Sequence, residues 1–398
     1  MVTADLGLSP VSNAFLTTEQ LASPEDMFPL KAWYCISCHL VQLQDFQSSE
    51  DHFNSNYAYF SSFSSSWLEH TEKYVEKMIS GLGLDSRSSV VEVASNDGYL
   101  LQFFKRAKIP VLGIEPSANV AKAAEQNHGI QTVCKFFGQA TAKELREDGV
   151  LADLMVANNV LAHVPDIKDF VTGFKTLLAP TGTVTFEFPH LLNLIEENQF
   201  DTIYHEHYSY LSLTAVEGIL RSCGLMIYDV EEVSTHGGSL RPYVCHVEAN
   251  RTPSRNVTAM LEREGSAGLL DSRCYTRFQK QVTETKTKLV NFLQEEKSAG
   301  NKIICYGAPA KGNTLLNYCD IGKDIIDYTV DLNPHKQGLY LPGSHIPILA
   351  PEEIYRTKPD LIVILPWNLV DEITSQLSYV REWGGRFVIP IPEPIVVE

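Results

Sequence analysis

The segment that decides the fold is SVVEVASNDGYLLQFF, residues 89–104. Its beginning, SVVEVA, is short, apolar and rich in valine, which is typical of a buried strand. From Tyr99 the sequence YLLQFFKRA has the length and composition of a helix. Four small or polar residues, Ser95 to Gly98, separate the two. A strand that passes through a short turn into a helix is the repeating unit of a parallel α/β sheet.

The alternation continues on both sides of this segment. Apolar residues recur at helical spacing from Trp67 to Ile79, before the glycines of GLGLDSRSS. Further strands are predicted at 109–115, 129–134 and 152–160, and helices at 117–129 and 138–149. The alternating pattern at 235–248 predicts strands that close this unit. The fold class is therefore α/β, with a doubly wound parallel sheet.

The rest of the chain divides into three further parts. Residues 1–66 are rich in Ser, Pro and aromatics without a clear period, which predicts a small irregular module. The sheet just described fills residues 67–250, and residues 251–299 are charged and mostly helical, which predicts a connector. From residue 300 the strand and helix rhythm restarts, so residues 300–398 are expected to form a second, smaller α/β domain.

Composition excludes several classes of partner. The 398 residues carry 32 Lys+Arg against 49 Asp+Glu, a net charge of −17, and no basic block offsets it, so nucleic acid is not an expected partner. An anionic substrate would need local donors such as helix N-termini. The longest apolar runs have the length of strands and the N-terminus lacks a signal-peptide pattern, so we expect no membrane span and a cytoplasmic location.

Two of the eight cysteines are closely spaced. Cys35 and Cys38, in YCISCHL, have the spacing of half a zinc knuckle. The alternative is a reduced pair beside a strand, since a structural zinc site usually has four ligands and no second CxxC occurs. Further ligands would come from His39, His52 or outside this chain.

The carboxyl ends of the predicted strands point to a cofactor. The turn after residue 94 is not GxGxxG, so it does not fit a dinucleotide pyrophosphate. Glu115 follows Asn96 by 19 residues, at the end of the next strand, which is the place of a carboxylate that binds both hydroxyls of a ribose. Adenosine without phosphates indicates S-adenosylmethionine. The expected cofactor-binding residues are Glu92, Ala94, Ser95, Asn96, Gly98, Tyr99, Leu100, Glu115, Pro116, Asn158, Asn159 and His163.

The sequence YHEHYSY, residues 204–210, gathers proton-transferring side chains. A zinc protease motif is excluded because HExxH requires a second histidine where Ser209 stands. A metal-binding HxH pair and a hydrogen-bonded corner remain possible readings. If the segment is a strand, His205 and His207 share one face and Glu206 points away.

Across nearly its full length the chain resembles the S-adenosylmethionine-dependent sugar C-methyltransferases, which methylate carbon 3 of nucleotide-linked 4-keto-deoxysugars. The segments that carry the resemblance are LSPVSNAFL, FPLKAWYCISCHLVQL, YAYFSSFSSSWLEH, EVASNDGYLLQFF, GIEPSANVA, NNVLAHVPD, FEFPHLLNLIEENQFDTIYHEHYSYLS, THGGSLR, GAPAKGNTLLNY and VDLNPHKQGLYLPG. The resemblance implies an N-terminal zinc-binding module, a central class I methyltransferase domain and a C-terminal α/β domain. Family members carry an earlier cysteine pair before LGLSPVSNAFL, and this sequence shows no such pair. We therefore expect any metal on Cys35 and Cys38 to be structural and weakly held.

The resemblance also implies roles for residues. His207 would be the base that removes the carbon 3 proton, with Tyr204 and Glu206 beside it, and Tyr57 or Tyr59 would lie over the sugar. In GAPAKGNT, Asn313 stands where a P-loop needs lysine, so the segment is not a P-loop. It is expected either to form a capped turn between a strand and a helix or to bind the nucleotide sugar. THGGSLR is likewise either a hairpin or a phosphate contact. The expected substrate-binding residues are His163, His205, His236, Gly237, Gly238, Ser239, Arg241, Lys311 and Asn313.

The resemblance predicts a monomer or small homo-oligomer whose substrate is a nucleotide-linked sugar. Two other enzyme classes stay open at this point. A methyltransferase that acts on oxygen, nitrogen or another carbon acid would not need this acceptor, and a nicotinamide-dependent oxidoreductase is disfavoured by the missing GxGxxG. A binding module built on the CxxC segment would explain only the first sixty residues.

Overall fold

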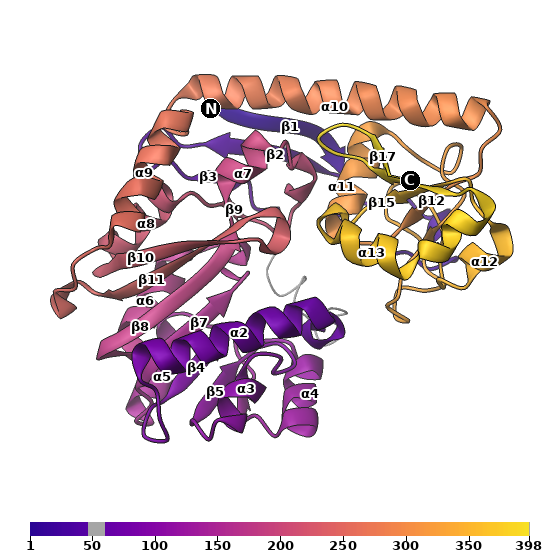
Figure 1. Ribbon diagram of the computed structural model, residues 1–398. Coiled ribbons are helices and arrows are strands. Elements are labelled where there is room, and N and C mark those ends of the chain that lie inside the picture. Colours follow the sequence, from indigo (N-terminus) through magenta and orange to yellow (C-terminus); the bar gives the residue numbers. More distant parts are fainter. Residues whose placement is uncertain (47–59, 398) are drawn as a thin grey trace.

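The computed structural model describes residues 1–46 and 60–397. The predicted residues Tyr57 and Tyr59, and the possible ligand His52, lie outside the described residues. Three sheets organise the chain (Figure 1). In the described part, none of the helices combines the length and apolar character that crossing a membrane requires.

The N-terminal sheet has four antiparallel strands in the order β1-β2-β3-β9. Its strands are β1 (Val2–Ser9), β2 (Phe28–Tyr34), β3 (Val41–Leu43) and β9 (Ser209–Tyr210). The last strand comes from YHEHYSY and pairs Tyr210 with Val41. The N-terminal module and the histidine cluster are thereby held in one sheet.

The central sheet has seven strands in the order β10-β11-β8-β7-β4-β5-β6. The strands are β4 (Val90–Val93), β5 (Val111–Ile114), β6 (Thr132–Val133), β7 (Ala152–Asn158), β8 (Leu178–Pro189), β10 (Leu225–Val233) and β11 (Ser239–His246). The strands from which the parallel sheet was predicted, β4 to β7, pair in parallel, whereas β11 is antiparallel to both of its neighbours. The short connection from β10 to β11 leaves no room for the crossover that a parallel pair needs.

Helices cover both faces of the central sheet, as a doubly wound sheet requires. Val90 and Leu154 face a core with α2 (Ser65–Leu82), α3 (Leu101–Arg106) and α4 (Ala118–His128). Val91 and Met155, one residue further along each strand, face a core with α5 (Gln139–Glu147), α6 (Ile167–Leu177) and α8 (Leu213–Ser222). The helix predicted from Tyr99 begins two residues later, at Leu101.

The C-terminal sheet has six strands in the order β14-β13-β12-β15-β16-β17, parallel except for β17. Its strands are β12 (Ile303–Tyr306), β13 (Thr329–Val330), β14 (Ile348–Leu349), β15 (Leu361–Ile364), β16 (Arg386–Ile389) and β17 (Ile395–Val397), and its helices are α11 (Ala310–Cys319), α12 (Glu353–Thr357) and α13 (Val370–Gln376).

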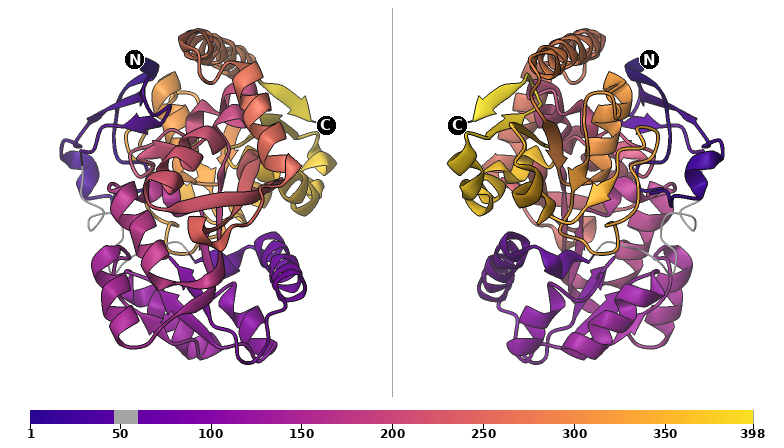
Figure 2. Two further views of the ribbon diagram at one scale, coloured as in Figure 1. Left: turned by 90° about the vertical axis from the view of Figure 1, so that its left-hand side faces the viewer. Right: turned by 90° about the vertical axis from the view of Figure 1, so that its right-hand side faces the viewer.

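The long helix α10 (Ser272–Ser298) is more than a connector. It follows α9 (Arg255–Ala267) and runs beside β1 toward the C-terminal sheet (Figures 1 and 2). Its buried residues Phe278 and Val282 belong to a core that also contains Leu30 of β2, Phe200 and Leu315 of α11. The N-terminal sheet, the segment around residue 200 and the C-terminal domain therefore share one apolar core, which fixes their relative positions.

A buried carboxylate joins α9 to the central domain. Glu264 is fully buried and accepts hydrogen bonds from His190 Nε2 (2.8 Å), Leu213 N (2.6 Å), and the backbone and side chain of Thr214. Burial by itself raises the pKa of Glu264, but the hydrogen bonds from His190 and Thr214 outweigh burial and hold the pKa below its usual range. The carboxylate is thus the cap of α8 and an anchor for α9.

Replacing Glu264 by glutamine is expected to lower the free energy of unfolding by about 1.5–3 kcal/mol, the contribution of hydrogen bonds to a charged group. Because the folded pKa is lowered, this stabilisation is present above the unfolded pKa and is lost as the pH falls through the folded one. Urea unfolding at pH 7 and at pH 4 should therefore show a smaller difference from the parent at the lower pH. Glu262→Gln, on the exposed face of α9, is the matched control. An equal effect of both variants would contradict the assigned role.

Candidate active site

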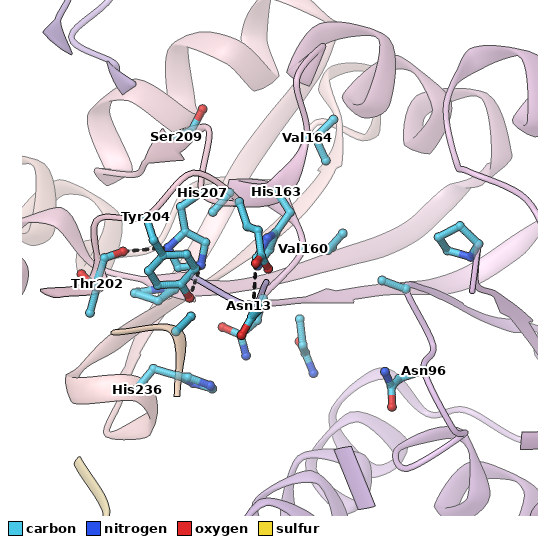
Figure 3. Close-up of a pocket in the computed structure, with 18 of the residues that line it drawn as sticks. Asn13, Asn96, Val160, His163, Val164, Thr202, Tyr204, His207, Ser209 and His236 are labelled. Carbon is cyan, nitrogen blue, oxygen red and sulfur yellow. Dashed lines mark hydrogen bonds between the residues drawn. The ribbon is translucent and has the colours of Figure 1, made fainter. Parts of the chain in front are cut away.

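A cavity of about 1200 Å³ lies where the N-terminal module, the central sheet and the C-terminal domain meet. Its walls come from residues 11–15, from the carboxyl ends of β4, β5 and β7, from residues 202–211, and from residues near 310 and 335. Figure 3 shows Tyr204 and His207 on one side of this cavity and Asn96 on the other. Open α/β sheets bind ligands at this edge.

The carboxyl ends of β4 and β7 carry backbone strain. Ala94, Asn96 and Asn159 have φ of 56°, 48° and 53°, the left-handed region that non-glycine residues rarely adopt. Asn96 N and Ser117 N donate hydrogen bonds of 3.0 and 2.8 Å to the two carboxylate oxygens of Glu115. The carboxylate is therefore fixed between two strand ends in the cavity wall. Burial raises the pKa of Glu115.

This end of the cavity fits the adenosine part of S-adenosylmethionine. Asn159 Oδ1 is buried, and among the described residues it has no hydrogen-bond partner. Buried polar atoms in this state call for a ligand or water. The rings of Trp67 and Tyr99 stack at 5.9 Å in the same wall, and Phe136 adds a further apolar surface. Polar atoms, a carboxylate and flat apolar surfaces are what a nucleoside requires.

The structure brings together most of the predicted cofactor-binding residues. Those that line the cavity are Ala94, Asn96, Tyr99, Glu115, Pro116, Asn158, Asn159 and His163. Glu92, Ser95, Gly98 and Leu100 lie behind its wall. Gly98 (φ 80°) has a packing role instead, because a Cβ there would lie 2.7 Å from Ile130 Cδ1.

His207 is held as a neutral ring whose basic nitrogen accepts a hydrogen bond from a tyrosine. Its Nδ1 lies 3.0 Å from the carbonyl oxygen of Thr202, which can only accept, so Nδ1 carries the proton. Its Nε2 lies 2.8 Å from the hydroxyl of Tyr204 and is left with the lone pair. Burial, and next the charge of His163, lower the pKa of His207 well below its usual range. Figure 3 shows both hydrogen bonds.

Residues 204–208 lie outside the strands, so the condition for the expected alternation of side chains is not met. Residues 205 and 206 occupy a turn, so His205 and His207 do not share a face. His205 points toward the N-terminal module, with Nε2 at 3.3 Å from Pro29 O and its ring 5.9 Å from that of Phe28. Glu206 lines the cavity, accepts a 2.6 Å hydrogen bond from Asn13 Nδ2, and has its pKa raised by burial to about 7.

Two lysines of the C-terminal domain face the cavity. Lys311 lies 4.2 Å from the centre of the Trp367 ring and donates to Asn368 Oδ1. Burial lowers the pKa of Lys311 to about 8, although the charge of Asp201 opposes the shift. Lys336 donates to Ala308 O at 2.9 Å, and burial lowers its pKa as well. Sequence reasoning missed Lys336 and Asn13, although both lie in segments that carry the resemblance.

Arg241 does not contact the cavity. It is 4% exposed, pairs with Glu187 and Glu231, and lies 4.6 Å from the centre of the Tyr74 ring. The alternative of an ordinary structural role is therefore correct for this residue. Burial of an arginine is tolerated here because both carboxylates compensate its charge.

His205 and four other predicted substrate-binding residues also lie outside the cavity wall. Gly237 and Gly238 form a turn with φ of 84° and 102°, and a Cβ on Gly237 would lie 2.6 Å from the Trp367 ring. Ser239 Oγ donates to Thr235 O, and Asn313 Nδ2 donates to Ser12 O. His163, His236 and Lys311 are the members of the predicted substrate-binding set that line the cavity.

Cys35 and Cys38 lie in a turn between β2 and β3. Backbone N–H groups of Cys38 and Ser37 lower the pKa of the Cys35 thiol, which favours the thiolate that binds metal. Within residues 1–46 and 60–397, however, no group of three or more His, Cys, Asp or Glu residues is placed to hold a metal ion. His39 Nδ1 is hydrogen-bonded to Tyr34 OH instead. The described residues thus do not complete a tetrahedral zinc site.

Three family models cover the chain. They are a putative zinc binding domain over residues 2–53, a methyltransferase domain over residues 67–230, and the C-methyltransferase C-terminal domain over residues 234–392. Among curated proteins, the C-methyltransferase NovU of Streptomyces niveus is 34% identical over 391 residues, which cover 98% of this chain and 93% of that protein.

Solved structures also resemble part of the chain. Magnesium protoporphyrin IX methyltransferase of Synechocystis, with bound SAH, is 17% identical at a TM-score of 0.36 and covers 45% of this chain and 83% of its own. An S-adenosylmethionine-dependent methyltransferase of Clostridium acetobutylicum is 12% identical at a TM-score of 0.37, covering 47% and 92%. On the identity and coverage shared with NovU and the match to all three models, the chain belongs to the S-adenosylmethionine-dependent C-methyltransferases.

Proposed function

We propose that the enzyme transfers a methyl group to carbon 3 of a nucleotide-linked 4-keto-deoxysugar, with His207 as the base that forms the enolate. The observation that carries the proposal is the state of His207, a partly buried neutral ring whose Nε2 lone pair lies in the cavity that also contains Glu115. A C–H bond beside a carbonyl is acidic enough for such a base to remove its proton. Methylation of an oxygen or a nitrogen would not require a carbonyl beside the acceptor.

The chemistry of carbon methylation determines what the residues must do. When bound, S-adenosylmethionine supplies an electrophilic methyl on a sulfonium. Glu115, Asn159 and the rings of Trp67 and Tyr99 would hold its adenosine. His207 Nε2 would take the carbon 3 proton, while Nδ1–H stays on Thr202 O and keeps the ring in one orientation. A ring that is neutral at working pH is ready to accept a proton.

The enolate oxygen needs a donor, and the turn supplies two. The Tyr204 hydroxyl donates to the Nε2 lone pair, so it marks the position that the reacting C–H bond must take. Once displaced, this hydroxyl would donate to the carbonyl oxygen at carbon 4. Glu206, with its pKa near 7, can be protonated and could donate as well, or receive the proton from the site after transfer.

The diphosphate of the substrate would lie against Lys311 and Lys336. In a protein of net charge −17, lysines that line the cavity are needed to offset a diphosphate. A third lining lysine, Lys135, is already paired with Glu144. Lys311 and Lys336 come from α11 and from the segment after β13, on the opposite side of the cavity from Glu115. The C-terminal domain would thus bind the nucleotide sugar, and the central domain would bind the cofactor.

Lys311→Ala is expected to raise the Michaelis constant for the nucleotide sugar about 10- to 100-fold, since a charge-assisted hydrogen bond contributes roughly 1.5–3 kcal/mol. Affinity for S-adenosylhomocysteine should not change. Because the pKa of Lys311 is near 8, the parent Michaelis constant should rise above that pH and the variant's should not. Steady-state kinetics across pH, with Lys323→Ala on the surface as the control, measure both effects. A defect confined to cofactor binding would contradict the assignment.

The acceptor itself is tested by methyl transfer to a panel of thymidine, uridine and guanosine diphosphate sugars, each with and without a 4-keto group. Product should form with a 4-keto sugar and carry the new methyl on carbon. Transfer to a sugar hydroxyl in the absence of any keto group would refute the proposal.

A further inference from the structure

One motif of the C-terminal domain is not explained by substrate binding. Asn313 and Thr314, in GAPAKGNT, are each 1% exposed and lie in the first turns of α11. Thr314 Oγ donates a 3.0 Å hydrogen bond to the carbonyl oxygen of Ile203, and Asn313 Nδ2 donates a 2.6 Å hydrogen bond to that of Ser12. Both side chains therefore hold backbone of other domains beside the cavity.

Ile203 occupies a particular position relative to the base. The residue before it, Thr202, accepts the Nδ1 proton of His207, and the residue after it, Tyr204, donates to Nε2. The Ile203 carbonyl is thus the backbone group between the two partners of the imidazole. Ile203 is 1% exposed, so loss of the Thr314 hydroxyl would leave this carbonyl buried and unsatisfied unless the backbone turned.

The other contacts of this segment support the same reading. Trp367 Nε1 donates a 2.7 Å hydrogen bond to Asp201, and the rings of Phe200 and Tyr318 lie 5.4 Å apart. Residues 200–203 are therefore held from α11 and from the loop after β15. Of these residues, Thr314 is the one that is hydrogen-bonded to Ile203, the residue next to Tyr204.

We propose that Thr314 is a positioning residue for His207, which acts from the C-terminal domain through the Ile203 carbonyl. The inference rests on the proposed role of His207 as the base. A general packing role would depend on the size of residue 314. The positioning role depends on its hydroxyl and predicts a change in the tautomer of one imidazole, that of His207. Small displacements of a catalytic group are costly, since proton transfer depends on alignment.

Thr314→Val, which keeps the shape and removes the hydroxyl, is expected to lower kcat by about 10- to 100-fold with an unchanged affinity for S-adenosylhomocysteine. The ¹⁵N spectrum of histidine-labelled enzyme, with the His207 signals assigned from His207→Asn, should change from one tautomer to a mixture. Thr314→Ser should restore both. Thr183→Val, which removes an equally buried hydroxyl in the middle of β8, should match the parent in kcat and in the His207 spectrum.

The spectrum is read without sugar substrate, so the two proposals fail separately. A parent enzyme that methylates no 4-keto sugar would refute the proposed function, and the spectrum would still decide the role of Thr314. Parent kcat and a parent His207 spectrum in Thr314→Val would overturn the inference. Should the valine variant not fold, Thr314→Cys is tested, because a thiol is a weak donor of similar size. The same two parent-like results would overturn the inference there too.

Discussion

His207→Asn is expected to lower turnover by about 10²- to 10⁴-fold, the usual contribution of a general base. Asparagine can still donate to Thr202 O, so the turn should keep its shape, but no basic nitrogen remains at the position of Nε2. Single-turnover methyl transfer with saturating substrates measures the loss. Binding of S-adenosylhomocysteine, followed by calorimetry, should survive.

His205→Asn is the matched control for this variant. It lies two residues away and is buried, but its ring faces Phe28 and Pro29 rather than the cavity. Its effect on turnover should be smaller and should accompany a loss of stability. If both variants lost the same turnover, the histidines would act as scaffold and the base would be another group, with Glu206 or His163 the next candidates.

Glu115→Ala is expected to weaken S-adenosylmethionine binding on the order of 10²-fold, because it removes charge-assisted hydrogen bonds to the ribose that contribute roughly 1.5–3 kcal/mol each. The substitution also releases Asn96 N and Ser117 N, which the carboxylate holds in the free enzyme. Both effects weaken the site in the same direction. Titration calorimetry with S-adenosylhomocysteine measures the affinity.

Glu115→Gln separates the two effects, because the amide oxygen can still accept one backbone hydrogen bond while the charge is lost. Glu125→Ala, exposed on α4, controls for the change in net charge. Since burial raises the pKa of Glu115, parent affinity should rise as the pH increases through that pKa. Unchanged affinity in Glu115→Ala would mean that the end of β5 does not hold the ribose.

Local patterns predicted the central sheet and the meeting of its strand ends at one edge, which lines the cavity. The strand SVVEVA is buried on both faces, so its apolar run identifies it, and the polar residues after each strand had to meet at one edge. What was missed depends on contacts between distant segments. β9 has two residues and forms because it pairs with β3. A strand this short has no recognisable pattern of apolar and polar residues in the sequence.

The errors at the site have the same physical origin. The spacing of YHEHYSY fits a strand, but the turn at residues 205 and 206 orients the side chains differently. Arg241 lies in a motif that suggests an anion contact, yet its partner Glu187 is 54 residues away in β8 and is invisible to local reading. Asn13 carries no local signal either, because its partner Glu206 is 193 residues away in the sequence.

The central claim is that His207 removes the proton from carbon 3, and the direct test is wash-in of solvent deuterium at that carbon. The parent enzyme with S-adenosylhomocysteine bound, which cannot donate a methyl, is incubated with a nucleotide-linked 4-keto sugar, and the enzyme-free exchange rate is subtracted. We predict exchange at carbon 3 catalysed by the parent and reduced by about 10²-fold or more in His207→Asn. Exchange at the parent rate in that variant would contradict the account.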